Sequence, residues 1–181
     1  LDGISAAIRY ELGPVKVNCV VQRGVNEHQI PKLVRKFRGT GVIVRFIEFM
    51  DVGSTNGWTQ GQVVPTSEII DFLSSEFDLI PLARKSASDV ASRWAHSDDS
   101  GEIGFISSVS QPFCGDCVRA RLSSDGKFFT CLFTTTGHDM SALIRSGGKT
   151  EVLTQSIEEV WSARKDRYSE ERPSVAIPLP R

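Results

Sequence analysis

Three cysteines have the clearest capacity for chemistry in this sequence. Cys114 and Cys117 form a C-x2-C pair, and Cys131 follows within the same 18-residue window. Four cysteines in 181 residues are too few for a disulfide scaffold, so the clustering of three of them indicates a metal centre. Free thiols persist in a reducing compartment, and we therefore expect a cytoplasmic protein.

The number of ligands bears on the kind of centre. A structural zinc site closes with four protein ligands, whereas a four-iron cluster held by three thiolates leaves one iron open. His138 could be the fourth ligand of a zinc site, because it lies seven residues past Cys131. Free cysteines in a β-rich core are the remaining alternative.

Residues 118–133 predict a β-hairpin that carries Cys131, and its register follows from the sequence. A two-residue Asp-Gly turn would place Cys131 opposite Ala120, on the wrong face. A three-residue loop, Ser124–Gly126 with its glycine left-handed, places Cys131 opposite Arg119 instead. We predict the three-residue loop, because it brings the three cysteines to one face.

This register also predicts what surrounds the cysteines. Arg119 and Arg121 share their face, where two guanidinium groups would offset the negative charge of a cluster or bind phosphate. Leu122 and Phe128 are expected to pack on the reverse face of the hairpin.

Two basic residues lie inside strand-like and otherwise apolar segments. Lys16 interrupts VKVNCVV, and Arg45 interrupts VIVRFIEFM. A buried strand tolerates such a charge mainly where it points into a polar cavity or meets an anion; the alternative is a strand end that reaches solvent. Glu48 is placed in the same way, and the sequence assigns it no role.

The same segments predict the architecture of the first part of the chain. Residues 15–21 and 42–50 have the pattern of buried strands, and Ile30 to Phe37 between them has helical spacing. Strand, helix and strand with a short crossover predict parallel neighbours. Such a sheet needs further strands, so we expect residues 1–52 to be the last βα units of an incomplete (β/α) barrel.

Residues 53–181 predict an α+β domain with antiparallel hairpins, which makes the whole chain α/β in class. Its expected elements are a helix beginning near Thr66, a hairpin over residues 91–109, the hairpin with Cys131, and helices over residues 139–145 and 151–164. The apolar stripe of the last helix, which includes Trp161, is interpreted as core, and the charged run Arg164–Arg172 as solvated surface.

Composition excludes several classes of protein. The chain is 40% hydrophobic and 24% charged, which is ordinary for a globular protein. Its net charge of −1 gives no electrostatic case for nucleic-acid binding. No apolar run approaches the roughly 18 residues of a membrane span, so we expect no membrane partner.

The segment FCGDCVRARLSSDGKFFTCLF resembles the C-terminal cluster motif of the GTP 3′,8-cyclase family of molybdenum cofactor biosynthesis (MoaA). Further segments are similar to that family and occur in its order: PVKVN, RFIEFMDVG, NGW, SVSQPFC and WSARKDRYSEER. The resemblance covers nearly the whole chain, and the ordered set with its cysteine spacing is highly specific.

Membership of that family implies a radical S-adenosylmethionine enzyme. In the family, a [4Fe-4S] cluster held near the N-terminus by C-x3-C-x2-C cleaves S-adenosylmethionine. The radical so formed starts the conversion of GTP to (8S)-3′,8-cyclo-7,8-dihydroguanosine 5′-triphosphate, the precursor of cyclic pyranopterin monophosphate. GTP and S-adenosylmethionine are therefore the implied partners.

The resemblance also implies roles for individual residues. Those matching Cys114, Cys117 and Cys131 bind an auxiliary [4Fe-4S] cluster whose open iron holds the guanine. The residue matching Met50 contacts S-adenosylmethionine. The implied GTP contacts are Lys16, Arg45, Arg119, Ala120 and Arg121. Residues 53–181 then form the cluster- and GTP-binding domain.

Two departures from the family pattern matter. The sequence contains no C-x3-C-x2-C, and its end at Arg181 lacks the family's paired glycines. We therefore expect a C-terminal fragment that is inactive by itself as a cyclase. A homodimer is expected, as is self-association through the exposed edge of a truncated barrel.

Two other functions fit parts of the pattern. One is a structural zinc or iron–sulfur module without enzymatic activity, which would leave Arg119 and Arg121 idle. The other is a different radical S-adenosylmethionine enzyme with an auxiliary cluster, which nucleotide binding would distinguish.

Overall fold

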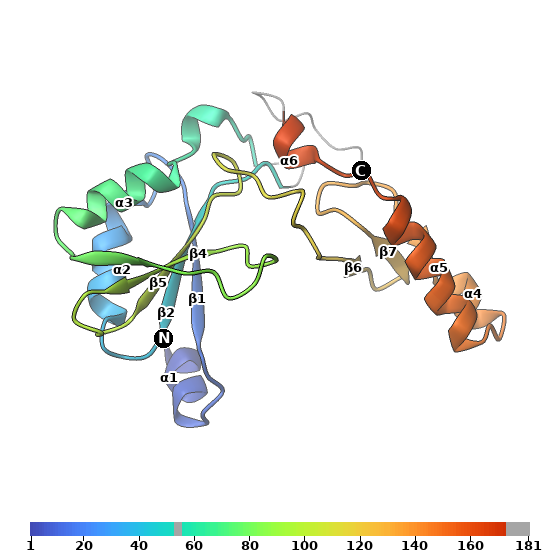
Figure 1. Cartoon of the computed structure of the whole chain (residues 1–181), viewed down its shortest axis with the longest axis horizontal. Coiled ribbons are helices and arrows are strands. Elements are labelled where there is room, and N and C mark those ends of the chain that lie inside the picture. The colour runs from blue at the N-terminus through green and yellow to red at the C-terminus, as the bar shows by residue number, and fades with distance from the viewer. Residues whose placement is uncertain (53–55, 173–181) are drawn as a thin grey trace. The chain divides into compact units, whose positions relative to one another are not determined.

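The computed structural model describes residues 1–52 and 56–172, which fall into two compact units (Figure 1). Unit 1 comprises residues 1–50 and 58–113, and unit 2 comprises residues 51–57 and 114–181. This division differs from the predicted boundary after residue 52, because strands between residues 79 and 106 continue the sheet that residues 16–48 begin.

Unit 1 is built on a five-stranded sheet with the strand order β1-β2-β5-β4-β3. The strands are β1 (Lys16–Val21), β2 (Ile43–Glu48), β3 (Leu79–Leu82), β4 (Ser92–His96) and β5 (Glu102–Ile106). β1, β2 and β5 run parallel, whereas β4 is antiparallel to β5 and β3 is antiparallel to β4. The predicted parallel pairing of the first two strands and the predicted β4–β5 hairpin are confirmed.

The helical elements of unit 1 are α1 (Asp2–Arg9), η1 (Glu27–Gln29), α2 (Ile30–Phe37), η2 (Gln60–Gln62) and α3 (Thr66–Ser74). Helices α2 and α3 lie against one face of the sheet (Figure 1). The alternate residues Val44 and Phe46 of β2 and Ile103 and Phe105 of β5 form the core with these helices. The opposite face is mixed: it carries Lys16, Asn18 and Arg45 together with the apolar Ile43 and Ile47.

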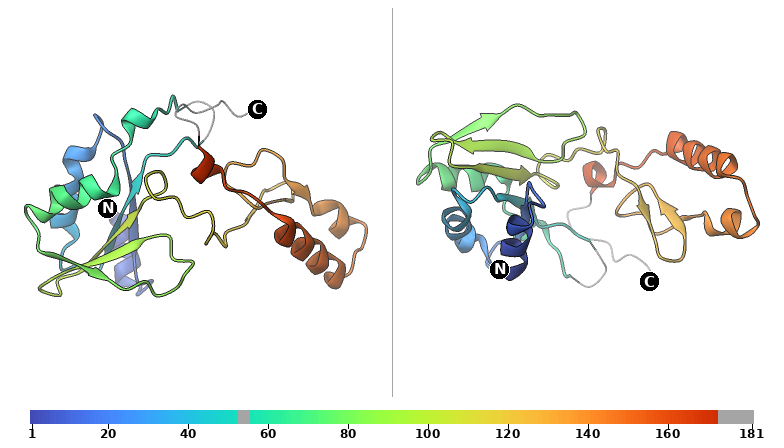
Figure 2. Two further views of the ribbon diagram at one scale, coloured as in Figure 1. Left: turned by 45° about the horizontal axis from the view of Figure 1, so that its top comes forward. Right: turned by 90° about the horizontal axis from the view of Figure 1, so that it is seen from below.

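In its described residues, unit 2 contains a small antiparallel sheet followed by helices (Figure 2). In order β6-β7-β8, the strands are β6 (Arg121–Leu122), β7 (Lys127–Phe129) and β8 (His138–Asp139). The helices are α4 (Ser141–Arg145), α5 (Thr150–Ala163) and α6 (Tyr168–Glu171).

The predicted register of the cysteine hairpin is confirmed beside its loop, but strand pairing ends at Arg121 and Phe129, so the predicted pairing of Arg119 with Cys131 is not formed. Leu122 pairs with Phe128, and the N–H of Ser123 donates to the carbonyl of Lys127 at 2.9 Å. The three-residue loop is closed by the Gly126 N–H, which donates to the Ser123 carbonyl, and Gly126 has a φ of 84°. This conformation favours glycine, as the type of loop requires.

Burial within unit 2 departs from expectation. Leu122 is 69% exposed instead of packing on the reverse face. Helix α5 has no buried residue, so the stripe that includes Trp161 is half-buried and not core. Strands of two or three residues are too short to build a covered face, which explains both differences. Among the helices of residues 1–52 and 56–172, none has the length and apolarity needed to cross a membrane.

Candidate functional site

Cys114 and Cys117 lie on a tight turn, as predicted. The N–H of Cys117 donates to the carbonyl of Cys114 at 3.2 Å, which closes a four-residue turn. Gly115 does not adopt a left-handed conformation there, and a Cβ at this position would meet no atom within 4 Å. The turn therefore does not require glycine.

The sulfur atoms of Cys117 and Cys131 accept hydrogen bonds from nitrogen donors. Arg119 Nη2 lies 3.5 Å from Cys117 Sγ, and the N–H of Phe133 lies 3.5 Å from Cys131 Sγ. Burial raises the pKa of the Cys117 thiol, but hydrogen bonds from the Arg119 backbone and guanidinium and from Arg164 outweigh it, so the pKa falls below its ordinary value. Cys117 is thus biased toward the thiolate, the form that binds metals.

The three cysteines are half-buried in unit 2, and their donor chemistry fits an iron–sulfur cluster: thiols with N–H donors and an arginine nearby. Within the described residues, no three His, Cys, Asp or Glu side chains converge as the ligands of a metal ion. His138, the alternative zinc ligand, is exposed on β8 opposite Phe128.

The charged run Arg164–Arg172 is solvated surface only in part: Lys165, Arg167, Glu170 and Glu171 are exposed, whereas the side chain of Arg172 is buried. Arg172 and Asp51 form an ion pair at 2.8 Å, with side chains 5% and 0% exposed. The hydroxyl of Tyr168 donates to the same carboxylate at 2.6 Å, and its ring stacks on Phe133 with centroids 4.2 Å apart. Burial and the bond to Asp51 raise the pKa of Tyr168 to about 12.

The face of the unit 1 sheet opposite the core carries a row of polar positions. Asn18, Arg45, Gly104 and Arg93 are aligned across four adjacent strands. Lys16 lies two residues before Asn18 and therefore on the same face. The structure thus brings Lys16 and Arg45, which the sequence singled out separately, to one surface.

Gly104 is the position in this row that lets Arg45 cross the neighbouring strand. A Cβ at Gly104 would lie 3.0 Å from Cγ of Arg45 and 3.5 Å from Cβ of Ala91. The missing side chain leaves space for the methylene groups of Arg45 over β5.

A pocket of about 100 Å³ lies on this face and is rich in cations. Its basic residues are Lys16, Arg45, Lys85 and Arg93, and its acidic residues are Asp89 and Glu102. Arg93 is held by Glu102 through two bonds of 2.8 and 2.7 Å. The guanidinium of Arg45, by contrast, forms no hydrogen bond or ion pair with any residue in the described ranges. An uncompensated guanidinium beside two lysines is suited to binding an anion such as phosphate.

Glu48, to which the sequence assigned no role, is a fully buried carboxylate that joins three segments of unit 1. It accepts the N–H of Thr66 at 2.8 Å, where α3 begins. It also accepts the N–H groups of Val109 and Ser110 at 2.8 and 2.7 Å and the Ser110 hydroxyl. These bonds fix the loops that follow β2 and β5 at the carboxyl ends of the two strands.

The remaining predicted residues are divided between the two units. Met50 follows β2 in unit 1 and is half-buried. Ala120 is exposed just before β6, and Arg121 is the first residue of β6. The sequence reasoning missed Asp51, Gly104 and Asp166, whose carboxylate accepts the hydroxyl groups of Thr130 and Thr134. A glycine within a strand and an acid within a loop give no signal until their distant partners are known.

Comparison with known proteins gives consistent results. Residues 42–170 match the family model described as Molybdenum Cofactor Synthesis C. The chain is 50% identical, over 97% of its length, to a protein named GTP 3′,8-cyclase from Xanthomonas axonopodis pv. citri, of which it covers 52%. A protein of the same name from Acidothermus cellulolyticus is 44% identical over 95% of the chain, which covers 49% of that protein. Another from Staphylococcus saprophyticus is 46% identical over 90% of the chain, which covers 48% of that protein. The chain thus spans about half the length of these relatives.

Proposed function

The chain belongs to the Molybdenum Cofactor Synthesis C family, and from this membership we propose that it is the part of a radical S-adenosylmethionine GTP 3′,8-cyclase that binds GTP and an auxiliary [4Fe-4S] cluster. The observation that carries the proposal is the identity of about half, over nearly the whole chain, to relatives named for that activity. The whole enzyme would convert GTP to 3′,8-cyclo-7,8-dihydroguanosine triphosphate. The parallel strands β1, β2 and β5 would belong to its (β/α) barrel.

In unit 2, Cys114, Cys117 and Cys131 are proposed to hold the cluster. A bound four-iron cluster with three thiolate ligands supplies one iron that can coordinate an atom of the purine. The hydrogen bonds to the sulfurs of Cys117 and Cys131 support this assignment, because they stabilise thiolates. Arg119, Ala120 and Arg121 are proposed nucleotide contacts from the same segment.

In unit 1, Lys16 and Arg45 are proposed to bind the phosphates of GTP. Their common face, the pocket they line, and the guanidinium of Arg45 without a partner in the described ranges support this role. Met50 is the proposed contact to S-adenosylmethionine. Because the chain has no C-x3-C-x2-C, it is proposed to bind GTP without turning it over.

Nucleotide binding by single-charge variants tests the phosphate assignment. Lys16→Gln and Arg45→Gln should each raise the Kd for GTP by about tenfold or more, since a hydrogen bond to a charged group contributes about 1.5–3 kcal/mol. Lys36→Gln, which removes an exposed charge on α2, is the matched control and should bind GTP as the parent does. Equal affinity in all three variants would contradict the assignment.

A further inference from the structure

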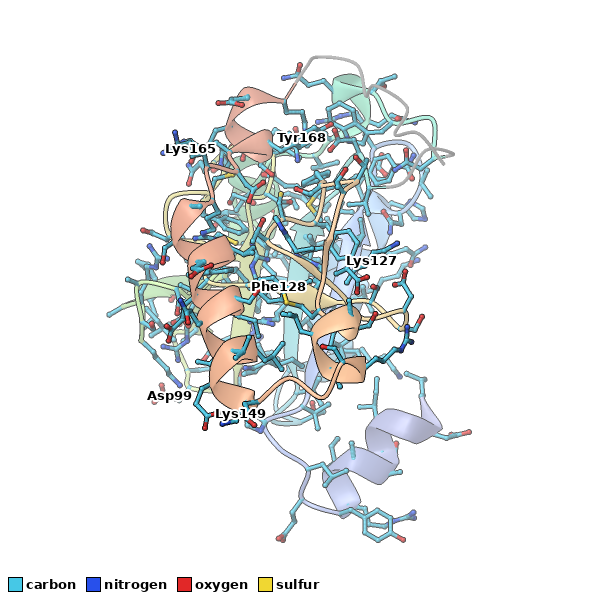
Figure 3. All side chains as sticks on the ribbon, turned by 90° about the vertical axis from the view of Figure 1, so that its right-hand side faces the viewer. Asp99, Lys127, Phe128, Lys149, Lys165 and Tyr168 are labelled. Atoms are coloured by element: carbon cyan, nitrogen blue, oxygen red, sulfur yellow. The ribbon has the colours of Figure 1, made fainter. Side chains whose placement is uncertain are left out.

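The short segment between α5 and α6 contacts both of the chain regions that carry the cysteines of unit 2. The segment runs from Arg164, the C-terminal cap of α5, to Arg167, the residue before α6. Figure 3 labels Lys165 within this segment and Tyr168 just after it. Its contacts reach residues more than 30 positions earlier in the chain.

Arg164 holds the C-x2-C turn. Its guanidinium lies over the Trp161 ring, 3.8 Å from the centroid, and donates through Nη2 to the main-chain carbonyl of Cys117. The stacking fixes the plane of the guanidinium, so the direction of its N–H groups is set before they meet the turn.

Asp166 holds the region around Cys131 from both sides. Its carboxylate accepts the hydroxyl of Thr130 at 2.6 Å and the hydroxyl of Thr134 at 3.2 Å. Thr130 is buried, and the two threonines flank Cys131 at one residue before it and three residues after it. A single carboxylate therefore fixes the chain on either side of this cysteine.

The end of the segment is anchored as well. Tyr168 stacks on Phe133, and Arg172 pairs with the buried Asp51, so the segment cannot slide along the two cysteine regions without breaking these contacts. Arg164 and Asp166 are only two positions apart. The distance between the Cys117 turn and the Cys131 region is therefore set through one short, tethered stretch of backbone.

We infer that Arg164 and Asp166 are positioning residues that clamp the Cys117 turn and the Cys131 region to one short segment of backbone. The inference rests on the proposed function, in which the three cysteines bind one cluster. Outer-shell residues of this kind hold metal ligands in place without touching the metal. Nothing in the clamp requires a titration; it works through hydrogen bonds and stacking.

The first test uses the metal-free chain and reads amide hydrogen exchange. Arg164→Gln should speed exchange in peptides covering residues 114–120, and Asp166→Asn should do so in peptides covering residues 129–135. Lys165→Ala is the matched control, because its exposed side chain lies between the two residues in the same segment (Figure 3). It should leave both regions unchanged. Unchanged exchange in Arg164→Gln and Asp166→Asn would overturn the clamp.

The second test follows cluster retention after anaerobic reconstitution with iron and sulfide. Both variants should lose iron to a chelator about tenfold faster than the parent, the lower end of what outer-shell substitutions cost metal sites. Arg164→Lys and Asp166→Glu, which keep the charge, should recover part of the loss and restore the visible spectrum. Parent-like retention in Arg164→Gln and Asp166→Asn would overturn the positioning role. A parent chain that takes up no iron would contradict the proposed function and leave hydrogen exchange to test the clamp.

Discussion

At the scale of single residues, Glu48 shows how a buried charge serves the fold. The carboxylate has no exposed surface, yet it accepts hydrogen bonds from three backbone N–H groups and one hydroxyl. Such a set offsets the cost of burying the charge, because every acceptor position has a donor. The carboxylate at position 48 thus has its donors within the fold, whereas Arg45 on the other face of β2 lacks a partner among the described residues.

Glu48→Gln is expected to lower the free energy of unfolding of unit 1 by about 2 kcal/mol, because an amide cannot accept bonds at its nitrogen and leaves backbone donors unpaired. Urea-dependent amide exchange of β2 peptides measures this loss. Glu76→Gln breaks only a partly exposed ion pair with Arg35 and should cost less than about 1 kcal/mol. A loss in Glu48→Gln no larger than in this control would contradict the account.

Individual residues differ in how well the sequence predicts them. The spacing of Cys114 and Cys117 predicts their turn, because both cysteines lie within one local segment. The pairing of Asp51 with Arg172 spans 121 positions and could not be predicted from local pattern. The charged run before Arg172 therefore resembled solvated surface until the fold supplied its buried partner.

Tyr168 belongs to the same buried group and gives it a pH dependence. Its pKa is raised to about 12 from an ordinary value of 10.0, first by burial and then by the bond to Asp51. Above pH 10 the unfolded chain loses this proton before the folded chain does, so the folded state binds more protons and stability falls as pH rises. The loss extends from about pH 10 to about pH 12 and is absent below this window.

Tyr168→Phe tests this linkage. The variant keeps the ring on Phe133 but has no proton to lose, so the stability difference between parent and variant should change between pH 10 and pH 12 and stay constant below pH 9. Denaturant unfolding of both proteins across that range measures the difference. A constant difference throughout would show that the phenol is not held protonated by the fold.

At the scale of elements, the β6–β7 hairpin is the element whose register the sequence predicted in most detail. The alternation of side chains between the two faces of a strand and the residue preferences of a three-residue loop were enough to predict the register, since both are local. Burial of Leu122 was predicted wrongly, because it depends on what covers the hairpin. The parallel pairing of β5 with β2 was not predicted either, because it joins segments separated by α3 and a hairpin.

The left-handed conformation of Gly126 in the loop of this hairpin leads to a prediction about stability. Gly126→Ala should lower the stability of unit 2 by about 1–2 kcal/mol or more, because its φ of 84° disfavours any other residue and a Cβ would lie 2.6 Å from Cβ of Ser141. Thermal unfolding followed by exchange in β7 peptides measures the effect. Gly115→Ala should leave stability unchanged, because a Cβ at this position would meet no atom within 4 Å and the residue does not have a left-handed φ. Equal behaviour of the two variants would contradict the loop assignment.

At the scale of the whole molecule, chemistry is divided between two units. Unit 1 offers a cationic pocket on the face opposite its core, and unit 2 offers three cysteines with nitrogen donors to two of their sulfurs. Strand β1 lies at the edge of the unit 1 sheet. Self-association through this edge and the expected homodimer stay predictions, and sedimentation of the purified chain would test both.

Cys114, Cys117 and Cys131 are proposed to bind one cluster with an iron open to GTP. The most direct test is anaerobic reconstitution with iron and sulfide, followed by electron paramagnetic resonance of the reduced protein with and without GTP. We predict about four irons per chain, loss of the cluster in Cys131→Ala, and a spectrum that GTP changes. One zinc per chain, no iron uptake and no response to GTP would contradict the claim and indicate a structural metal module instead.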